Sequence, residues 1–234
     1  MTENIRVQKL ISNYGYCSRR KAETLIEEGR VSVNGKKITI GDKAGTEDKI
    51  AVDGQVLKPE PKAYLVFHKP PGCVTALRDE QYKTVMDFIK VKQRVFPVGR
   101  LDYNTTGVLI LTNDGDFANL IMHPSNEVKK TYLVQLNRAV AYSDLKKIEK
   151  GIELEDGLTS PAKTLRLEPP DMVEVTIHEG KNRIIKRMFN YLGYKVLGLH
   201  RERIGELTVK GINPGRCKNM TKKEIEKLVF KNKK

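Results

Sequence analysis

GRLDYNTTGVLILT, residues 99–112, places one carboxylate, Asp102, among turn-forming residues directly ahead of an apolar run. The run predicts a buried strand over 108–112. An acid on a loop that leads into a strand is a common way to hold a catalytic side chain in place, so Asp102 is a candidate reacting group. Asp is also favoured in turns because its side chain bonds to nearby backbone groups, and this structural role is the alternative.

The segments around this stretch predict a larger α+β body over 61–234. Apolar or alternating runs predict strands at 63–67, 130–134 and 172–177, the last two of the half-buried antiparallel kind. Residues 68–72, His-Lys-Pro-Pro-Gly, predict a rigid loop. Asp114 and Asp116 are expected to serve as turn and cap residues of a following helix. A capping box at 221–224 predicts a last helix.

The first 60 residues predict a separate small domain. Apolar residues at helical spacing precede Gly15, and Ser18 is placed to cap a second helix over 19–28 that ends at Gly29. Short runs at 31–33 and 37–39 flank Asn34-Gly35, a strong hairpin signal. A second turn at Asp53-Gly54 follows, and prolines among charged residues near position 60 indicate a linker.

The charge of the chain is concentrated near its C-terminal end. Residues 1–60 carry 11 Lys and Arg against 9 Asp and Glu, residues 61–180 carry 16 against 16, and residues 181–234 carry 16 against 4. A net charge of +14 predicts a polyanionic partner, and this distribution suits a neutral reaction chamber with basic flanks. The tail 231–234 is basic as well, with improved solubility as its alternative role.

The cysteines, the histidines and the hydropathy of the chain argue against disulfide bonds, metal sites and membrane or export segments. Three separated cysteines form neither a disulfide framework nor a zinc pattern, and the four histidines lack metal-site spacing. The N-terminus has no signal-peptide pattern, and no apolar stretch is long enough to span a membrane. We therefore expect a protein of the cytoplasm, without a metal, and a monomer by default.

A first basic group, in the N-terminal domain, is a candidate RNA contact. Arg19, Arg20 and Lys21 stand at a helix start, where cations oppose the helix dipole, so backbone phosphates are a natural partner. Arg30, Lys36 and Lys37 at the nearby hairpin are placed to extend that basic face. An ordinary solvated helix end is the alternative.

A second basic group occupies residues 179–189, which predict a turn followed by a helix. Arg183 and Arg187 are four residues apart and are expected to share a helical face, with Lys186 beside them. Like charges at this spacing repel, so we expect an anion opposite them, either phosphate or a buried carboxylate such as Asp102. A basic surface helix without a special partner is the alternative.

The first domain resembles the alpha-L RNA-binding domain first known from a small-subunit ribosomal protein. The likeness rests on residues 6–11, 15–22 and 29–35. Residues 99–109, 129–132 and 179–188, in this order, resemble the RsuA/RluB-type family of ribosomal RNA pseudouridine synthases, over nearly all of residues 5–230. The resemblance implies a mainly antiparallel catalytic domain that isomerises a uridine in ribosomal RNA or a pre-ribosomal particle, without a cofactor.

The resemblance also implies roles for single residues. Asp102 matches the family aspartate, which acts either as a nucleophile or by promoting a glycal intermediate. Tyr132 matches the tyrosine that stacks on the uracil, with core packing as its alternative role. Lys186 matches the basic residue that pairs with the aspartate; many members have arginine there, whose planar fork lysine lacks. Arg100 is placed to reach the nucleotide's phosphate or the vacated stack, or to form a structural ion pair.

Three further readings stay open. The preferred substrate is large-subunit (23S) RNA, and small-subunit (16S) RNA is the alternative within the family. A non-catalytic ribosome-assembly factor is a second class. A hydrolase that cuts the base–sugar bond with paired carboxylates is a third, although the matching motifs contain no second acid.

Overall fold

The computed structural model describes residues 4–231, and most of the expected tail, 232–234, lies outside the described residues. The chain divides into two compact units. One contains residues 1–62 together with 92–94 and 113–115, and the other contains the rest. The first boundary lies two residues from the one expected at 60, but the two short segments were not expected in the first unit.

The first unit is a pair of helices packed on short strands. Its elements are β1 (Ile5–Arg6), α1 (Val7–Asn13), α2 (Arg19–Glu27), β2 (Val31–Val33), β3 (Lys36–Lys37), β4 (Lys43–Ala44), β5 (Ile50–Val52) and β6 (Gln55–Val56). The Ser18 side chain caps α2 by accepting from the Lys21 amide. Asn34-Gly35 turns the β2–β3 hairpin with both residues at positive φ. Strand β3 is shorter than expected, 36–37 in place of 37–39.

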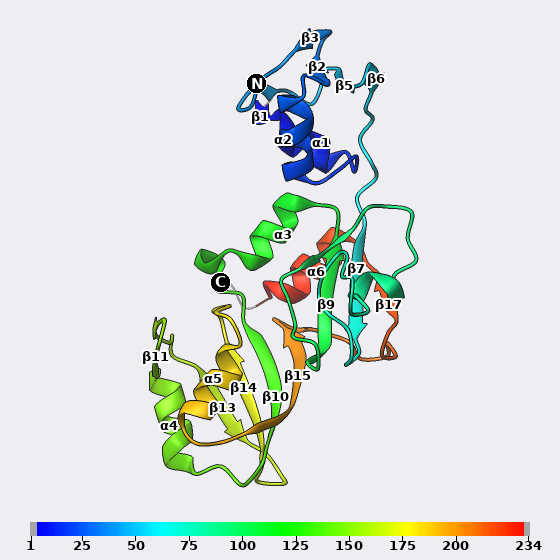
Figure 1. Ribbon diagram of the computed structural model, residues 1–234. Helices are drawn as coiled ribbons and strands as arrows, with labels where there is room; N and C mark the ends of the chain where they lie inside the picture. The colour runs from blue at the N-terminus through cyan, green and yellow to red at the C-terminus, as the bar shows by residue number, and fades with distance from the viewer. Residues whose placement is uncertain (1–3, 232–234) are drawn as a thin grey trace. The chain divides into compact units, whose positions relative to one another are not determined.

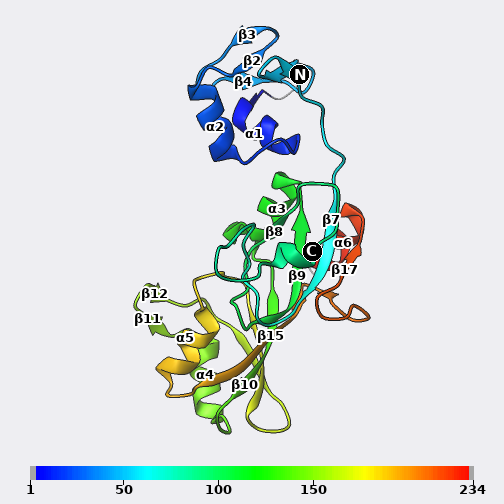
Figure 2. The same ribbon diagram turned by 45° about the vertical axis from the view of Figure 1, so that its right-hand side comes forward.

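The second unit is built on one mixed, mostly antiparallel sheet (Figures 1 and 2). Its main path has the order β13-β14-β10-β15-β9-β7-β17, with β16 beside β15 and β8 beside β9. Its elements are β7 (Tyr64–Lys69), the 3-10 turn η1 (Val85–Phe88), β8 (Phe96–Val98), β9 (Thr106–Thr112), α3 (Gly115–Met122), the turn η2 (Pro124–Asn126), β10 (Lys130–Leu136), α4 (Tyr142–Lys150), β11 (Glu153–Leu154), β12 (Gly157–Leu158), β13 (Lys163–Arg166), β14 (Met172–Ile177), α5 (Ile184–Tyr191), β15 (Val196–Ile204), β16 (Leu207–Thr208), β17 (Cys217–Asn219) and α6 (Lys222–Val229).

Strand β9 is buried on both faces, which explains its continuous apolar sequence. Leu109 and Leu111 join the core cluster that includes residues of α4 and α5, whereas Val108 and Ile110 join the cluster that includes residues of α3 and α6. Figure 1 shows α4 and α5 beside β13 and β14, and α3 and α6 beside β7 and β9. The strand that follows the Asp102 loop is therefore fixed from both sides. The expected α+β class and mainly antiparallel sheet are confirmed.

Four further local expectations need correction. Strand β7 continues to Lys69, because His68 and Lys69 still pair with β9, and Pro70 ends it. Helix α2 ends at 27 rather than 28. Asp116 lies in the first turn of α3 rather than ahead of it, since the helix begins at Gly115.

The fourth correction concerns Arg183. This residue precedes α5 in the left-handed conformation, with φ 49°. It therefore does not share a helical face with Arg187, as the spacing had predicted.

Candidate active site

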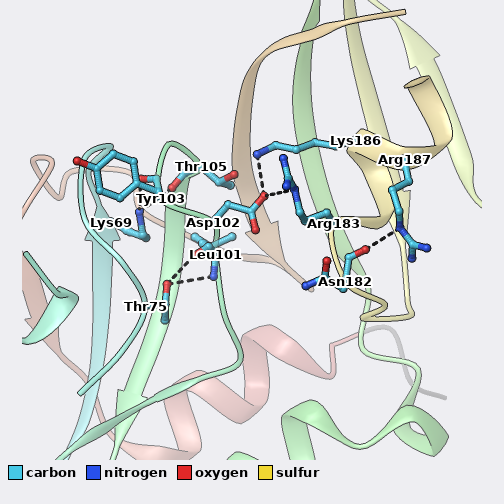
Figure 3. Close-up of polar contacts among 10 residues, drawn as sticks. All are labelled: Lys69, Thr75, Leu101, Asp102, Tyr103, Thr105, Asn182, Arg183, Lys186 and Arg187. Atoms are coloured by element: carbon cyan, nitrogen blue, oxygen red, sulfur yellow. Dashed lines mark hydrogen bonds and ion pairs between the residues drawn. The ribbon is translucent and has the colours of Figure 1, made fainter. Parts of the chain in front are cut away.

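The loop that carries Asp102 is held by two side chains from elsewhere in the chain. Thr75 binds the backbone of Leu101 in both directions: its hydroxyl donates to the Leu101 carbonyl at 2.7 Å, and the Leu101 amide approaches the same oxygen at 3.2 Å. Lys69, at the end of β7, is fully buried and donates to the carbonyls of Pro70, Tyr103 and Thr105 at 3.0–3.1 Å. Loop residues on both sides of Asp102 are thereby fixed (Figure 3).

Lys69 is an unusual residue to find at zero exposure. Burial disfavours its cation and lowers the pKa of the ammonium group. Its three carbonyl partners satisfy all three donors, which is the condition for keeping such a group inside a protein. The lysine therefore serves as an anchor of the loop rather than as a group that meets solvent.

Gly107 is the second residue of β9 and lies where β9 meets β15. It pairs in parallel register with Arg201 and has φ 111°. A Cβ at this position would collide with the backbone oxygen, carbon and nitrogen of Arg201. The glycine is thus required by both its conformation and the close approach of the two strands.

Asp102 points from this loop toward α5 (Figure 3). The Lys186 ammonium group donates to its Oδ2 at 2.7 Å, and Arg183 Nε lies 3.9 Å from the same oxygen. The Asp102 side chain remains 35% exposed and that of Lys186 24%. The carboxylate therefore has a direct counter-charge and still faces open space, as a group that must meet a substrate requires.

Arg187 has a different partner from the one expected. Its guanidinium forms two bonds to the Asp156 carboxylate, at 2.7 and 2.9 Å, and its Nε donates to the Asn182 carbonyl at 2.8 Å. The guanidinium lowers the pKa of Asp156. Arg187 thus ties the β11–β12 turn to α5, and Lys186 alone of the two faces Asp102.

Asp102 opens onto a cavity of about 850 Å³. Arg100, Arg183 and Tyr132 also line it. Tyr132 is only 8% exposed and belongs to the main core cluster as well, so its ring both packs and contributes to the cavity wall. Arg100 is exposed at the same cavity. Five sequence-predicted residues therefore gather in one place: Arg100, Asp102, Tyr132, Arg183 and Lys186.

Four residues of this region were missed by sequence reasoning. Lys69 and Thr75 hold the loop, and the half-buried Lys130 and the buried Arg201 line the cavity beside Tyr132. The spacing of Lys130 and Tyr132 carried a usable signal, because residues two apart on a strand face the same side. Nothing in the local sequence marked the others, since their partners lie far along the chain.

In the first unit the expected basic residues are exposed, but they differ in their partners. Arg30 binds the Asp53 carboxylate at 2.6 and 2.9 Å and Glu28 at 2.9 Å, and it lowers the pKa of Asp53. It braces the Asp53-Gly54 turn, so its availability to phosphate is reduced. The remaining exposed candidates are Arg19, Arg20, Lys21, Lys36 and Lys37.

Comparison with family models now gives these two units an identity. Residues 63–191 match the RNA pseudouridylate synthase model, and residues 5–50 match the S4 domain model. The chain belongs to the RNA pseudouridylate synthase family. It is an isomerase with an N-terminal S4 RNA-binding domain, as the sequence resemblance had implied.

Individual relatives of the family cover nearly the whole chain. The large-subunit pseudouridine synthase B of Bacillus subtilis is 43% identical over 95% of both chains. The dual-specificity RNA pseudouridine synthase RluF of Escherichia coli is 35% identical over 95% of this chain and 77% of its own. A crystal structure of a pseudouridylate synthase superposes with a TM-score of 0.71 at 34% identity, covering 96% of this chain and all of that one.

Two structural features are absent from residues 4–231 of this synthase. No helix there is long and apolar enough to cross a membrane. Among the same residues, no three His, Cys, Asp or Glu side chains are grouped as metal ligands would be.

Proposed function

We propose that this synthase converts a specific uridine of large-subunit ribosomal RNA to pseudouridine in the cytoplasm, with Asp102 as the reacting carboxylate. The observation that supports the role of Asp102 is its position: one partly exposed carboxylate, on an anchored loop, 2.7 Å from a lysine and at the wall of a cavity. The large-subunit target is supported by the 43% identity to the Bacillus subtilis large-subunit synthase.

The reaction exchanges one bond to the ribose for another. The bond between C1′ and N1 breaks, and its electron pair leaves with the uracil. Asp102 either attacks C1′ or removes a proton from C2′, and both routes need a carboxylate with a free lone pair. Lys186, at 2.7 Å, orients that carboxylate and balances its charge. The uracil then turns and C5 bonds to C1′, while the Asp102–C1′ bond breaks on the first route or C2′ regains its proton from Asp102 on the second. Finally C5 loses its proton and N1 gains one.

Tyr132 is proposed to receive the base. A uridine must leave its stack to reach Asp102, at a cost of a few kcal/mol. An aromatic ring at the wall of a water-poor cavity offsets that cost by stacking on the base. Arg100, exposed at the same cavity, is placed to bind the phosphate of the extruded nucleotide.

Asp102→Asn tests the proposed chemistry. The substitution removes the charge with little change in shape, so we expect no pseudouridine and nearly unchanged RNA affinity. Asp171→Asn, in the turn before β14, is the matched control and should keep full activity. Turnover by Asp102→Asn equal to that of the wild type would refute the assignment.

The target is tested by mapping pseudouridines in ribosomal RNA from cells with and without this protein. Loss of one large-subunit pseudouridine is the expected result. Loss of a small-subunit pseudouridine would instead support the small-subunit synthase activity. An unchanged map, in a comparison where the wild-type cells do contain the protein, would favour an assembly factor.

The S4 domain is proposed to supply phosphate contacts through Arg19, Arg20 and Lys21. Replacing all three by Gln should weaken RNA binding and flatten its salt dependence, by about 0.7–0.9 in logarithmic slope per lost contact. The single-turnover rate at saturating enzyme should change little. The control removes three exposed charges from another surface, Lys146, Lys147 and Lys150. Equal affinities at several salt concentrations would contradict this role.

A further inference from the structure

The cavity beside Asp102 has a floor made by one face of β10 and β15. Lys130 and Tyr132 are two residues apart on β10, and Arg201 of β15 lies directly opposite Tyr132 in the antiparallel register. All three line the cavity. Thr131 pairs with Arg203, so Glu202 is an extra residue, a β-bulge, between the two arginines. The bulge places Arg201 and Arg203 on opposite faces of the sheet.

Arg201 is a buried cation whose hydrogen bonding is incomplete. The residue is 3% exposed, and its Nε donates to the Val108 carbonyl at 2.8 Å. Its Nη2 is buried and has no hydrogen-bond partner in the part of the chain that the structure describes. The ion pairs found among residues 4–231 include none to Arg201. A guanidinium held out of water without an anion is strongly unfavourable, unless an anion arrives during function.

Lys130 adds a second positive charge to this floor. Among residues 4–231, its ammonium group donates to the carbonyls of Val128 and His178, at 3.2 and 3.4 Å. Burial, and to a smaller extent repulsion from Arg201, lowers the pKa of Lys130 to about 8. The cavity is also lined by the carboxylates Asp102 and Glu179, but neither is within ion-pair distance of Lys130 or Arg201. Asp102 is paired with Lys186, and Glu179 accepts from the Ser160 amide.

We propose that Lys130 and Arg201, the cationic floor, stabilise the uracil after it has detached from the ribose and while it turns. This inference rests on the proposed function. When C1′–N1 breaks, the electron pair stays on the base, and the resulting negative charge spreads from N1 to the two carbonyl oxygens. Preorganised positive groups in a water-poor site are the usual means of stabilising such developing charge. The two cations meet a negative charge that exists only after bond cleavage.

The backbone phosphate of the same nucleotide is the competing anion. It differs from the uracil in position, because a phosphate stays with the strand at the cavity mouth. The exposed Arg100 and Arg183 are available to it there. The cationic floor lies beside Tyr132, the proposed stacking ring, so the base is the part of the substrate that reaches it. The position of the pair therefore favours the base.

The experiment compares Lys130→Met and Arg201→Gln in the full-length enzyme with two matched controls. Lys129→Met removes the exposed lysine next to Lys130, and Arg203→Gln removes an arginine on the opposite face, paired with Glu174. Single-turnover rates and RNA affinities are measured on the mapped substrate. We expect each floor variant to lose about 10- to 1,000-fold in rate with affinity and salt slope unchanged. Both controls should keep the wild-type rate.

A second substrate isolates the charge on the base. RNA with 5-fluorouridine at the target carries a base that bears negative charge more easily, so cleavage should depend less on the cationic floor. We expect the defect of Lys130→Met, measured as consumption of the target nucleotide, to shrink at least several-fold on this RNA. This arm stands even if Arg201→Gln fails to fold.

Three results would overturn the proposal. The first is an unchanged single-turnover rate in Lys130→Met. The second is a weakened RNA affinity of the floor variants with a shallower salt slope, which would assign the floor to phosphate. The third is an equal rate defect of Lys130→Met on both RNAs. Failure of the proposed function itself is distinguishable, because it would appear as activity in Asp102→Asn or as no pseudouridine from the wild type.

Discussion

Replacing Lys186 by Met should slow pseudouridine formation while leaving the fold intact. Lys186 donates a 2.7 Å charge-assisted bond to Asp102 between side chains that are 24% and 35% exposed. Such a bond contributes about 1.5–3 kcal/mol. Because each 1.36 kcal/mol corresponds to a tenfold change in rate, kcat should fall about 10- to 150-fold. Arg183, 3.9 Å away, retains part of the counter-charge and prevents complete loss.

The assay is release of tritium from RNA labelled at uridine C5, since C5 loses its hydrogen in the reaction. Lys147→Met is the control, because it breaks a 2.8 Å ion pair with Asp144 on α4, away from the cavity. Lys186→Arg restores the charge with a planar group and should stay within about tenfold of the wild type. A wild-type rate for Lys186→Met, or an equal loss in Lys147→Met, would refute the reasoning.

Three other predictions concern the support of the site. Gly107→Ala should lower the unfolding free energy by several kcal/mol in urea denaturation. The control Gly157→Ala, at φ 95° but with open space around it, should lose only about 1 kcal/mol through backbone strain. Equal losses would show that the clash with the Arg201 backbone is unimportant. Thr75→Val removes both bonds to Leu101, so it should lower the unfolding free energy by about 1–3 kcal/mol and also lower kcat. Thr75→Ser should restore both quantities. A loss of stability with an unchanged kcat would contradict the anchoring role. The pKa of Lys130 is about 8 in the folded protein and 10.5 ordinarily, so the unfolded chain binds more protons between these pH values. The unfolding free energy of the wild type should therefore rise relative to that of Lys130→Met from pH 8 to 10.5. A difference between the two that stays constant with pH would disprove the pKa shift.

The residues that were predictable from sequence are those embedded in local motifs. Asp102 stands among turn formers ahead of a recognisable strand, and Tyr132 alternates within another. Lys186 was separable from Arg187 only through the family resemblance, because spacing alone made both candidates for the same anion. In the structure, Arg187 instead binds Asp156, on a turn 31 residues earlier.

The residues that were missed depend on pairing between distant strands. Arg201 faces the cavity because of a bulge at Glu202, and a one-residue shift in a strand exchanges its faces. The left-handed conformation of Arg183 was also invisible, since residues other than glycine seldom adopt it. Such features arise from tertiary packing and have no short-range sequence signal.

Lys69 links catalytic competence to the order of folding. Its ammonium group bonds to carbonyls 1, 34 and 36 residues further along the chain, so the Asp102 loop does not take its shape from its own sequence. The loop gains its anchor only when β7 has paired with β9. Partly assembled chains should thus be inactive rather than slow. Opening of the β7–β9 pair would then determine what fraction of molecules is able to react at any moment, and hydrogen exchange of the β7 and β9 amides measures that opening.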